Sequence, residues 1–321
     1  MPISPYFSIV IPVYNREREV ARALDSCFRQ SFRNFEVLVI DDASSDRTRD
    51  VVAQMGGTQA TLLRHEQNLG VCGARNTGVR AARGEWILFL DSDDEYTETA
   101  LQTIFERTQA FGGEVERLGF MYQLDTGGLS PLPHPDGQLL DYEGYLRWSE
   151  RATVTDFHNC IRRRTFQQVM LPEGRVYEDI YHLDFAKYFR TRLLADVVAT
   201  VHSDAPNRCA NLSVQARMAK ALTEAAAGAR SIDQLLRAHG PALSAFAPRR
   251  FETYRRMRVS YHLLAGEKGR GLGLAVRHLA EFPLCHLSWM IPAIGLFGPV
   301  ALARAQACAR RKHAVSQRVR P

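Results

Sequence analysis

WILFLDSDD, residues 86–94, joins five apolar residues directly to a cluster of three carboxylates. A short, continuous apolar run predicts a strand that is buried on both faces, as in a parallel sheet. The carboxylates then follow the carboxyl end of that strand, where open α/β sheets bind their ligands. Because clustered like charges repel, a divalent cation held by Asp91 and Asp93 is the simplest way to stabilise them.

The same residues also fit the start of a helix. Ser92, followed by Glu95 three residues later, forms a capping box for a helix that begins near Thr97. This stretch alone leaves metal binding and helix capping open, and the rest of the chain has to distinguish them.

The first hundred residues alternate between apolar runs and helical patterns. The runs occupy residues 7–13, 35–40, 61–65 and 86–90, and the helical patterns between them occupy residues 16–30, 44–55 and 71–82. This alternation predicts βαβ units and an α/β fold with a mostly parallel sheet. A second acidic cluster, Asp41-Asp42, ends the second run. Both clusters therefore lie at the same edge of the predicted sheet, which is the best indication of a site.

The usual nucleotide-binding fingerprints are missing. Pro12-Val13-Tyr14-Asn15 follows the first run where a dinucleotide-binding protein has a glycine-rich turn, and no phosphate-binding loop of the Gly-x-x-x-x-Gly-Lys-Ser/Thr type occurs. A Rossmann dehydrogenase and a P-loop enzyme are therefore disfavoured. If a diphosphate binds, a metal at Asp91 and Asp93 can neutralise it, because Mg²⁺ typically uses one or two carboxylates plus substrate phosphates.

The chain continues with a second set of elements. We expect helices at 97–112 and 141–149 and from residue 176, strands at 115–124, 159–161 and 195–201, and a loop at 126–138. The loop either flanks an acceptor site or is a plain surface excursion. Glu178 and Asp179 at a helix start either cap the helix, where the helix dipole stabilises their negative charges, or supply a carboxylate base.

Charge divides the chain into two halves. The first 207 residues hold 22 basic and 30 acidic residues, whereas the chain from Arg208 onward holds 19 basic and 5 acidic residues. This split indicates an acidic catalytic half and a tail that meets an anionic surface. No zinc finger or RNA-recognition motif is present, so we expect no nucleic acid partner.

Cysteines and the first residues bear on the compartment. The six cysteines are scattered without paired Cys/His spacing, which argues against a zinc site or a disulfide framework and indicates a reducing compartment. A basic region followed by an apolar stretch is absent at the start, so we expect no signal peptide.

Residues 214–321 form a basic region with helical patterns, and residues 282–303 within it carry no formal charge. We interpret this uncharged segment as an in-plane, membrane-associating segment with basic flanks that face anionic lipid. A buried helix pair and a single spanning helix, which Pro283, Pro292 and Pro299 would interrupt, are the alternatives.

Five motifs together resemble the family 2 glycosyltransferases, which have the GT-A fold. They are residues 7–15 as the opening strand, Asp41 to Asp46, Asn68 to Gly70 with Ala74 to Gly78, Asp91-Ser92-Asp93 as the Asp-x-Asp motif, and Glu178-Asp179. Each motif is weak alone, but their common order and spacing make the resemblance specific over about residues 6–213. We therefore expect a GT-A catalytic domain at 1–213 and a helical extension at 214–321.

The resemblance implies a role for particular residues. Asp93 and Asp91 would coordinate Mn²⁺ or Mg²⁺, Asp179 would be the general base, and Glu178 would be its reserve. The residues implied in nucleotide or donor binding are Pro12, Tyr14, Glu17, Asp42, Arg75, Asp91 and Arg208.

The resemblance also implies the activity. The protein would be an inverting hexosyl- or N-acetylhexosaminyltransferase that uses a nucleotide-diphosphate sugar, with UDP favoured as the nucleotide. Its acceptor would be a glycan or lipid-linked acceptor in cell-envelope polysaccharide synthesis, and the enzyme would be peripheral on the inner face of the cytoplasmic membrane. The alternative is a non-catalytic nucleotide-sugar-binding or membrane scaffold protein.

Overall fold

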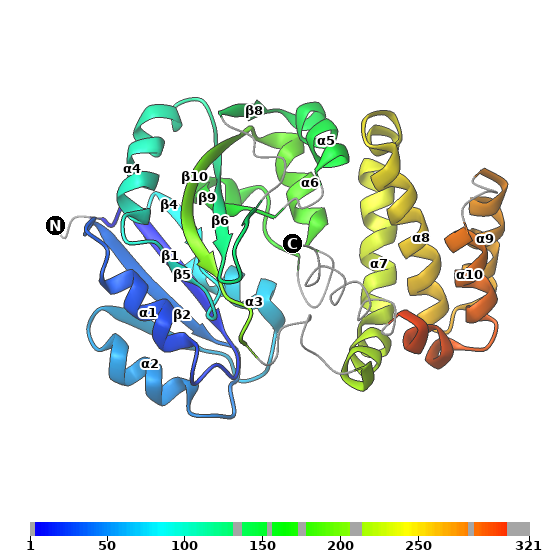
Figure 1. Cartoon of the computed structure of the whole chain (residues 1–321), viewed down its shortest axis with the longest axis horizontal. Coiled ribbons are helices and arrows are strands. Elements are labelled where there is room, and N and C mark those ends of the chain that lie inside the picture. The colour runs from blue at the N-terminus through cyan, green and yellow to red at the C-terminus, as the bar shows by residue number, and fades with distance from the viewer. Residues whose placement is uncertain are drawn as a thin grey trace. The chain divides into compact units, whose positions relative to one another are not determined.

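The structure is a computed structural model that describes residues 4–130, 137–152, 156–172, 178–205, 214–281 and 286–306. The chain folds as two compact units. The first, called the sheet unit below, comprises residues 1–174 and 178–204, and the second, called the helical unit, comprises the remaining residues. Figure 1 shows a sheet with flanking helices in the first and helices alone in the second.

One mixed sheet forms the centre of the sheet unit. Its strands are β1 (Phe7–Val13), β2 (Phe35–Asp41), β3 (Ala60–Arg64), β4 (Trp86–Phe89), β5 (Glu95–Tyr96), β6 (Arg117–Leu124), β7 (Leu129–Ser130), β8 (Gln138–Leu140), β9 (His158–Arg162) and β10 (Thr191–Val201). Their order is β3-β2-β1-β4-β9-β6-β10-β5, with β7 beside β6 and β8 beside β10.

The first four long strands confirm the predicted parallel arrangement, because β1 pairs in parallel with both β2 and β4, and β2 pairs in parallel with β3. Strand β9 then enters antiparallel between β4 and β6. This reversed strand brings residues near 158 beside the carboxyl end of β4. A prediction of parallel βαβ units does not anticipate this placement.

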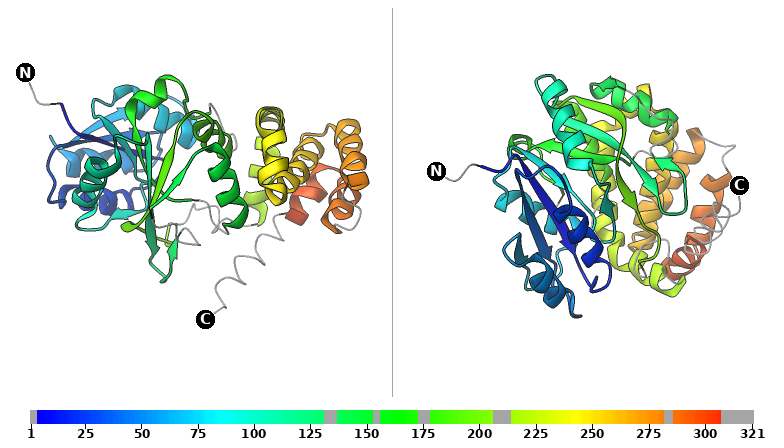
Figure 2. Two further views of the ribbon diagram at one scale, coloured as in Figure 1. Left: turned by 90° about the horizontal axis from the view of Figure 1, so that it is seen from above. Right: turned by 60° about the vertical axis from the view of Figure 1, so that its left-hand side comes forward.

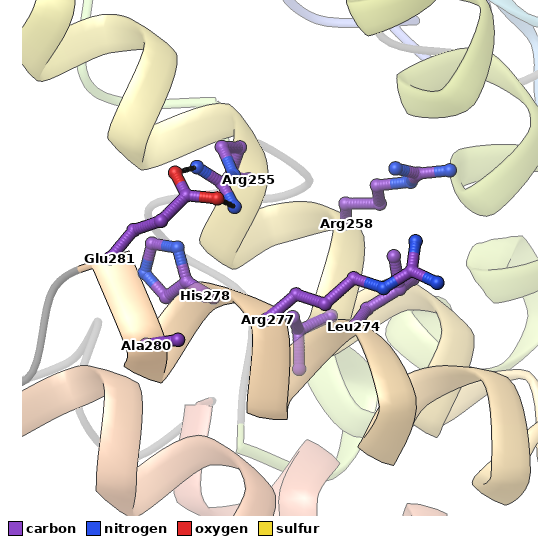
Figure 3. Close-up of a pocket in the computed structure, with 8 residues that line it drawn as sticks. Arg255, Arg258, Leu274, Arg277, His278, Ala280 and Glu281 are labelled. Atoms are coloured by element: carbon purple, nitrogen blue, oxygen red, sulfur yellow. Dashed lines mark hydrogen bonds and ion pairs between the residues drawn. The ribbon is translucent and has the colours of Figure 1, made fainter.

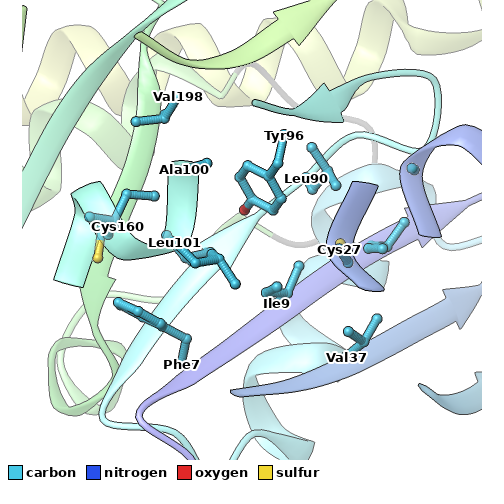
Figure 4. Packing of buried hydrophobic residues seen from close by; sticks show 14 of the residues in the cluster. Phe7, Ile9, Cys27, Val37, Leu90, Tyr96, Ala100, Leu101, Cys160 and Val198 are labelled. Atoms are coloured by element: carbon cyan, nitrogen blue, oxygen red, sulfur yellow. The ribbon is translucent and has the colours of Figure 1, made fainter. Parts of the chain in front are cut away.

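Helices cover both faces of the sheet. They are α1 (Val20–Phe28), α2 (Thr48–Gly56), α3 (Gly70–Ala81), α4 (Ala100–Phe111), α5 (Tyr142–Arg151) and α6 (Asp179–Tyr188), with a short 3₁₀ turn at Arg163–Gln167. Side chains of α1, α2 and α4 share one buried cluster with Ile9 and Ile11 of β1 (Figure 4). Val10 points to the other face and joins a cluster with side chains of α3 and α6. Because successive strand residues point to opposite faces, one apolar run supplies both layers.

The capping interpretation of Ser92 is wrong. The nearest helix is α4, whose N-cap position is Thr99, and residues 95 and 96 form the short strand β5 instead. The Asp94 amide donates to the Asp91 carbonyl at 3.0 Å, so the carboxylates occupy a tight turn after β4. The carboxylates of this turn therefore do not cap a helix.

Glycine 78 sets the position of α3. A Cβ atom at Gly78 would lie 2.2 Å from Cγ1 of Val10, so only glycine lets this helix pack so closely on β1. The close packing carries Arg75, one turn earlier on α3, to the carboxyl edge of the parallel strands.

The helical unit includes α7 (Val214–Phe246), α8 (Pro248–Leu264), α9 (Lys268–Glu281) and α10 (His286–Gly295), which pack side by side (Figures 1 and 2). Gly228 of α7 faces the Tyr261 ring of α8, where a Cβ atom would lie 2.4 Å from the ring. Among the described residues, no helix is both long and apolar enough to cross a membrane. Residues 282–285 of the uncharged segment lie outside the described residues.

Candidate active site

Two loops at the carboxyl ends of β1 and β2 are held together by side chains. The backbone N–H of Asn15 donates to Oγ of Ser44 at 2.9 Å, and the backbone N–H of Ser45 donates to Oδ1 of Asn15 at 2.9 Å. Asn15 and Ala43 have positive φ angles of 52° and 64°, which are uncommon for residues with a Cβ atom. Such conformations persist where the surroundings impose them, and they cluster at functional sites.

Asp42 anchors the first turn of α3. Its carboxylate accepts hydrogen bonds from the backbone N–H groups of Leu69 and Gly70, both at 2.8 Å, and it contacts Nδ1 of His65 at 2.7 Å. A carboxylate is favoured at this position because the first backbone N–H groups of a helix have no partner inside the helix. Asp42 thus links the second acidic motif to the helix that carries Arg75.

A pocket of about 280 Å³ opens at the carboxyl ends of β4 and β6. Its wall includes Arg75 from α3, Asp91 and Asp94 from the turn after β4, Glu178 from the start of α6, and Asn159 from β9. Residues from three of the five predicted motifs therefore line one cavity, whereas Asp42, Asp93 and Asp179 are not among the residues that line it.

Arg75 joins two of those motifs. Its Nη2 donates to Oδ1 of Asp91 at 2.8 Å, and its Nη1 donates to Oε2 of Glu178 at 3.1 Å, while the guanidinium lies 5.3 Å from the centre of the Phe89 ring. Only 15% of the Arg75 side chain is exposed, against 48% for Asp91 and 38% for Glu178. Burial alone would lower the pKa of Arg75, but the two carboxylates raise it above its ordinary value.

The Glu178 side chain makes this ion pair rather than a helix cap. Glu178 is the N-cap residue of α6, but its side chain accepts no capping hydrogen bond. Asp179 is the first residue of the helix and lies next to it, although of the two only Glu178 is among the residues that line the pocket.

The other two carboxylates of the turn are more buried than Asp91. Asp93 is 8% exposed and Asp94 is 7% exposed. The Asp93 carbonyl accepts a hydrogen bond from Nη2 of Arg22, and Oδ1 of Asp94 accepts one from the backbone N–H of His202 at 3.0 Å. These contacts fix the backbone of the turn from its far side.

The donor set fits a hard divalent cation only in part. Within the residues that the structure describes, no three His, Cys, Asp or Glu side chains cluster closely enough to hold a metal ion by themselves. Asp91 and Asp93 supply the oxygen ligands that Mg²⁺ or Mn²⁺ prefers, and such ions commonly take their remaining ligands from substrate phosphates and water. The residues present therefore suit a cation that arrives with a phosphorylated substrate.

One aspartate and two histidines in the pocket wall were not predicted from the sequence, namely Asp156, His158 and His182. Withdrawal from water and the nearby Asp91 carboxylate raise the pKa of Asp156 to about 6. Burial lowers the pKa of His158 to about 4 and that of His182 to about 3. Both imidazoles are therefore neutral at neutral pH. They are isolated polar residues on unremarkable segments, so no sequence pattern signals them.

The remaining predicted donor-binding residues are spread along the same edge. Tyr14 follows β1 and is 45% exposed, whereas Pro12 is buried within β1 beside Ile40 of β2. Oε2 of Glu17 accepts a hydrogen bond from the backbone N–H of Arg47 at 3.0 Å. Arg208 lies outside the described residues. The roles of these residues stay predictions.

The sheet with its acidic pocket at the strand ends is an arrangement of the GT-A type. The fold matches the crystal structure of S. aureus TarS residues 1–349 in complex with UDP-GlcNAc, with a TM-score of 0.56 and 18% sequence identity over 87% of this chain and 93% of that one. The family model for "Glycosyl transferase family 2" matches residues 8–168, and the chain belongs to this family.

Curated relatives match over shorter stretches. An uncharacterized glycosyltransferase of Haemophilus influenzae is 44% identical over 101 residues, and the succinoglycan biosynthesis protein ExoO of Rhizobium meliloti is 38% identical over 111 residues. The glucosyltransferase WfgD of Escherichia coli is 41% identical over 95 residues. These stretches cover 30%, 35% and 30% of this chain, and only 34%, 32% and 38% of the respective relatives.

Proposed function

We propose that the chain is an inverting, metal-dependent glycosyltransferase that moves a sugar from a nucleotide-diphosphate donor to a hydroxyl group. The observation that carries this proposal is the Arg75 guanidinium, which joins Asp91 and Glu178 across one pocket. A non-catalytic sugar-binding protein has no need for a carboxylate such as Glu178 in the same pocket as the Asp-x-Asp turn.

The donor and the pathway rest on the relatives. A UDP-GlcNAc complex of a protein with the same fold supports a UDP-sugar donor. ExoO is named for succinoglycan biosynthesis, AmsB for amylovoran biosynthesis, and WfgD for glucosyl transfer to a diphosphoundecaprenol-linked sugar. We therefore propose a glycan or lipid-linked acceptor in the synthesis of a cell-surface polysaccharide.

The chain's own residues divide the work of transfer. Asp91 and Asp93 would hold Mn²⁺ or Mg²⁺, which would act as a Lewis acid toward the negative charge on the leaving diphosphate. Arg75 holds Asp91 in place and also engages Glu178. Glu178 is already paired with the Arg75 guanidinium. We therefore assign Asp179 as the base that removes the proton of the attacking hydroxyl, with Glu178 as the reserve.

The Asp93→Ala variant tests the proposal. We expect it to lose detectable turnover and metal-dependent nucleotide binding, measured as nucleotide release from UDP-, GDP- and dTDP-sugars with Mn²⁺ or Mg²⁺. The Asp50→Ala variant is a matched control, because Asp50 is exposed on α2. Near-normal turnover of Asp93→Ala would contradict the proposal, and so would the failure of the wild-type protein to release nucleotide from any of these donors.

The helical unit suggests where the enzyme works. Arg255, Arg258 and Arg277 line a cleft of about 430 Å³ between α8 and α9, together with Glu281 (Figure 3). We propose that this basic face meets the anionic inner surface of the cytoplasmic membrane, where a lipid-linked acceptor would be found.

A further inference from the structure

His182 lies one helical turn after Glu178 on α6 and lines the same pocket. Residues four positions apart on a helix share a face, so the imidazole is a neighbour of the proposed acid pair. Its Nδ1 lies 3.1 Å from Nη1 of Arg117, a residue of β6. None of the roles assigned above uses His182 or Arg117.

The contact with Arg117 determines which ring nitrogen of His182 carries the proton. A guanidinium has only donor groups, so Nδ1 of His182 has to accept the hydrogen bond. An accepting Nδ1 carries no proton, and the neutral ring then has its proton on Nε2. The low pKa of His182, caused by burial and by the Arg117 charge, is consistent with a neutral ring.

Arg117 is an unusual residue for this position. Its side chain is fully buried, with the guanidinium 4.4 Å from the Phe185 ring and 5.2 Å from the Phe157 ring. Its Nε donates to Oγ1 of Thr191 at 2.9 Å. Among the described residues, Arg117 makes no ion pair with a carboxylate. A buried cation without a carboxylate is costly, although aromatic faces compensate in part.

The pocket side of His182 offers hydrogen-bonding capacity. Nε2 makes no hydrogen bond to any described residue and is not among the buried polar atoms. Two other polar atoms in the pocket wall, Oη of Tyr181 and Oδ1 of Asn159, are buried and have no partner in the part of the chain that the structure describes. Polar groups of this kind generally mark a place where a ligand or water completes the hydrogen bonds.

We propose that Arg117 is a positioning residue that fixes the Nε2–H tautomer of His182, and that this N–H donates a hydrogen bond to a hydroxyl oxygen of the donor sugar. The inference rests on the proposed function for the identity of the ligand, whereas the tautomer is independent of it. His182 then determines sugar specificity, because an N–H group held in one place can form its hydrogen bond with a hydroxyl oxygen at only one position of the sugar ring.

Long-range ¹H–¹⁵N correlation spectra of the imidazoles test the tautomer in the wild-type protein at neutral pH. We expect His182 to show a protonated Nε2 and an unprotonated Nδ1, assigned by the loss of its signals in the His182→Gln variant. A protonated Nδ1, or a doubly protonated ring, would overturn the role of Arg117. This measurement requires no ligand and no activity.

Calorimetric binding of UDP, UDP-glucose, UDP-galactose and UDP-GlcNAc tests the ligand. For the UDP-sugar that the wild-type protein binds more tightly than UDP, we expect the His182→Phe variant to lose about three- to tenfold in affinity, as for one neutral hydrogen bond. Its affinity for UDP should stay within about twofold of the wild type by the same criterion. His182→Gln should restore most of the loss, because its amide can still donate.

Lys187→Ala is the matched control, since Lys187 is exposed on the same helix. Equal sugar affinity in the wild-type and His182→Phe proteins would overturn the contact while leaving the proposed function intact. If none of the three UDP-sugars binds the wild-type protein more tightly than UDP, the ligand part of the inference is wrong. Loss of turnover in Asp93→Ala would still support the proposed function in either case.

Discussion

The pocket of the sheet unit and the cleft of the helical unit differ in how their arginines are balanced by acidic side chains. In the sheet unit, the single Arg75 lies between Asp91 and Glu178, and acidic side chains outnumber it in the pocket wall. In the helical unit, three arginines line one cleft with a single glutamate (Figure 3). Nη2 of Arg255 donates to Oε1 of that glutamate, Glu281, at 2.9 Å.

This difference in charge indicates which ligands the pocket and the cleft can bind. A carboxylate-rich pocket favours a cation, and hence a substrate that brings a metal and phosphates with it. An arginine-rich cleft favours an anion directly, because guanidinium groups match the geometry of phosphate. Arg277 sharpens the contrast, since no ion pair or hydrogen bond of its guanidinium is found among the described residues.

The largest effect is expected in the acidic pocket. Asp179→Asn removes the proposed base, so transfer should fall by about 10²–10⁴-fold. Binding of the donor should be little changed, because the amide keeps the size of the side chain. Single-turnover transfer and calorimetric UDP-sugar binding measure the two quantities separately.

Glu178→Gln is the comparison for that variant. Its loss should be smaller than that of Asp179→Asn, because Glu178 is engaged by Arg75. If Glu178→Gln alone abolishes transfer while Asp179→Asn remains active, the assignment of the base is wrong.

A smaller effect is expected in the basic cleft. The double variant Arg258→Gln/Arg277→Gln removes two positive charges, and binding to vesicles of anionic phospholipid should weaken by about 25-fold at low salt, since each basic residue near such a surface contributes about 1 kcal/mol. Co-sedimentation with vesicles measures the partition.

Arg230→Gln/Arg237→Gln is the charge-matched control, because both residues are exposed on α7. A loss as large as that of the cleft variant would mean that net charge, rather than the cleft, attracts the surface. Equal recovery of wild-type protein in the supernatant with anionic and neutral vesicles would contradict the membrane proposal.

The smallest expected effect is on the pH dependence of the free energy of unfolding, through a histidine of the acidic pocket. His158 has a pKa of about 4 in the folded chain because of burial, below the ordinary value of about 6.5 for histidine. The unfolded chain therefore binds one more proton between these values, so this contribution to stability is present above pH 6.5 and is lost as the pH falls toward 4. His158→Gln should flatten the dependence of the free energy of unfolding by about 1.4 kcal/mol per pH unit in that window.

Urea unfolding at pH 5, 6 and 7 measures this slope. The Gln Nε2 can still reach Oη of Tyr96, which Nε2 of His158 contacts at 3.1 Å. His278→Gln in the basic cleft is the comparison, since burial and then Arg255 lower the pKa of His278 as well. Slopes unchanged by His158→Gln would show that His158 is not held neutral.

The sequence by itself determined the parallel half of the sheet and the edge on which the site lies. Each apolar run ends in polar or acidic residues, and because parallel strands share a direction, Asp42 and Asp91 had to reach the same edge. The basic character of residues 214–321 was also plain from the sequence.

Only the tertiary structure decided which side chains meet there. The reversed strand β9 carries His158 into the pocket, and β6 brings Nη1 of Arg117 to 3.1 Å from Nδ1 of His182. Arg75 joins Asp91 to Glu178, although 103 positions separate it from the latter. The physical reason is that the hydrophobic periodicity of a segment indicates only which of its own residues are buried, whereas hydrogen bonds between segments depend on how the whole chain packs.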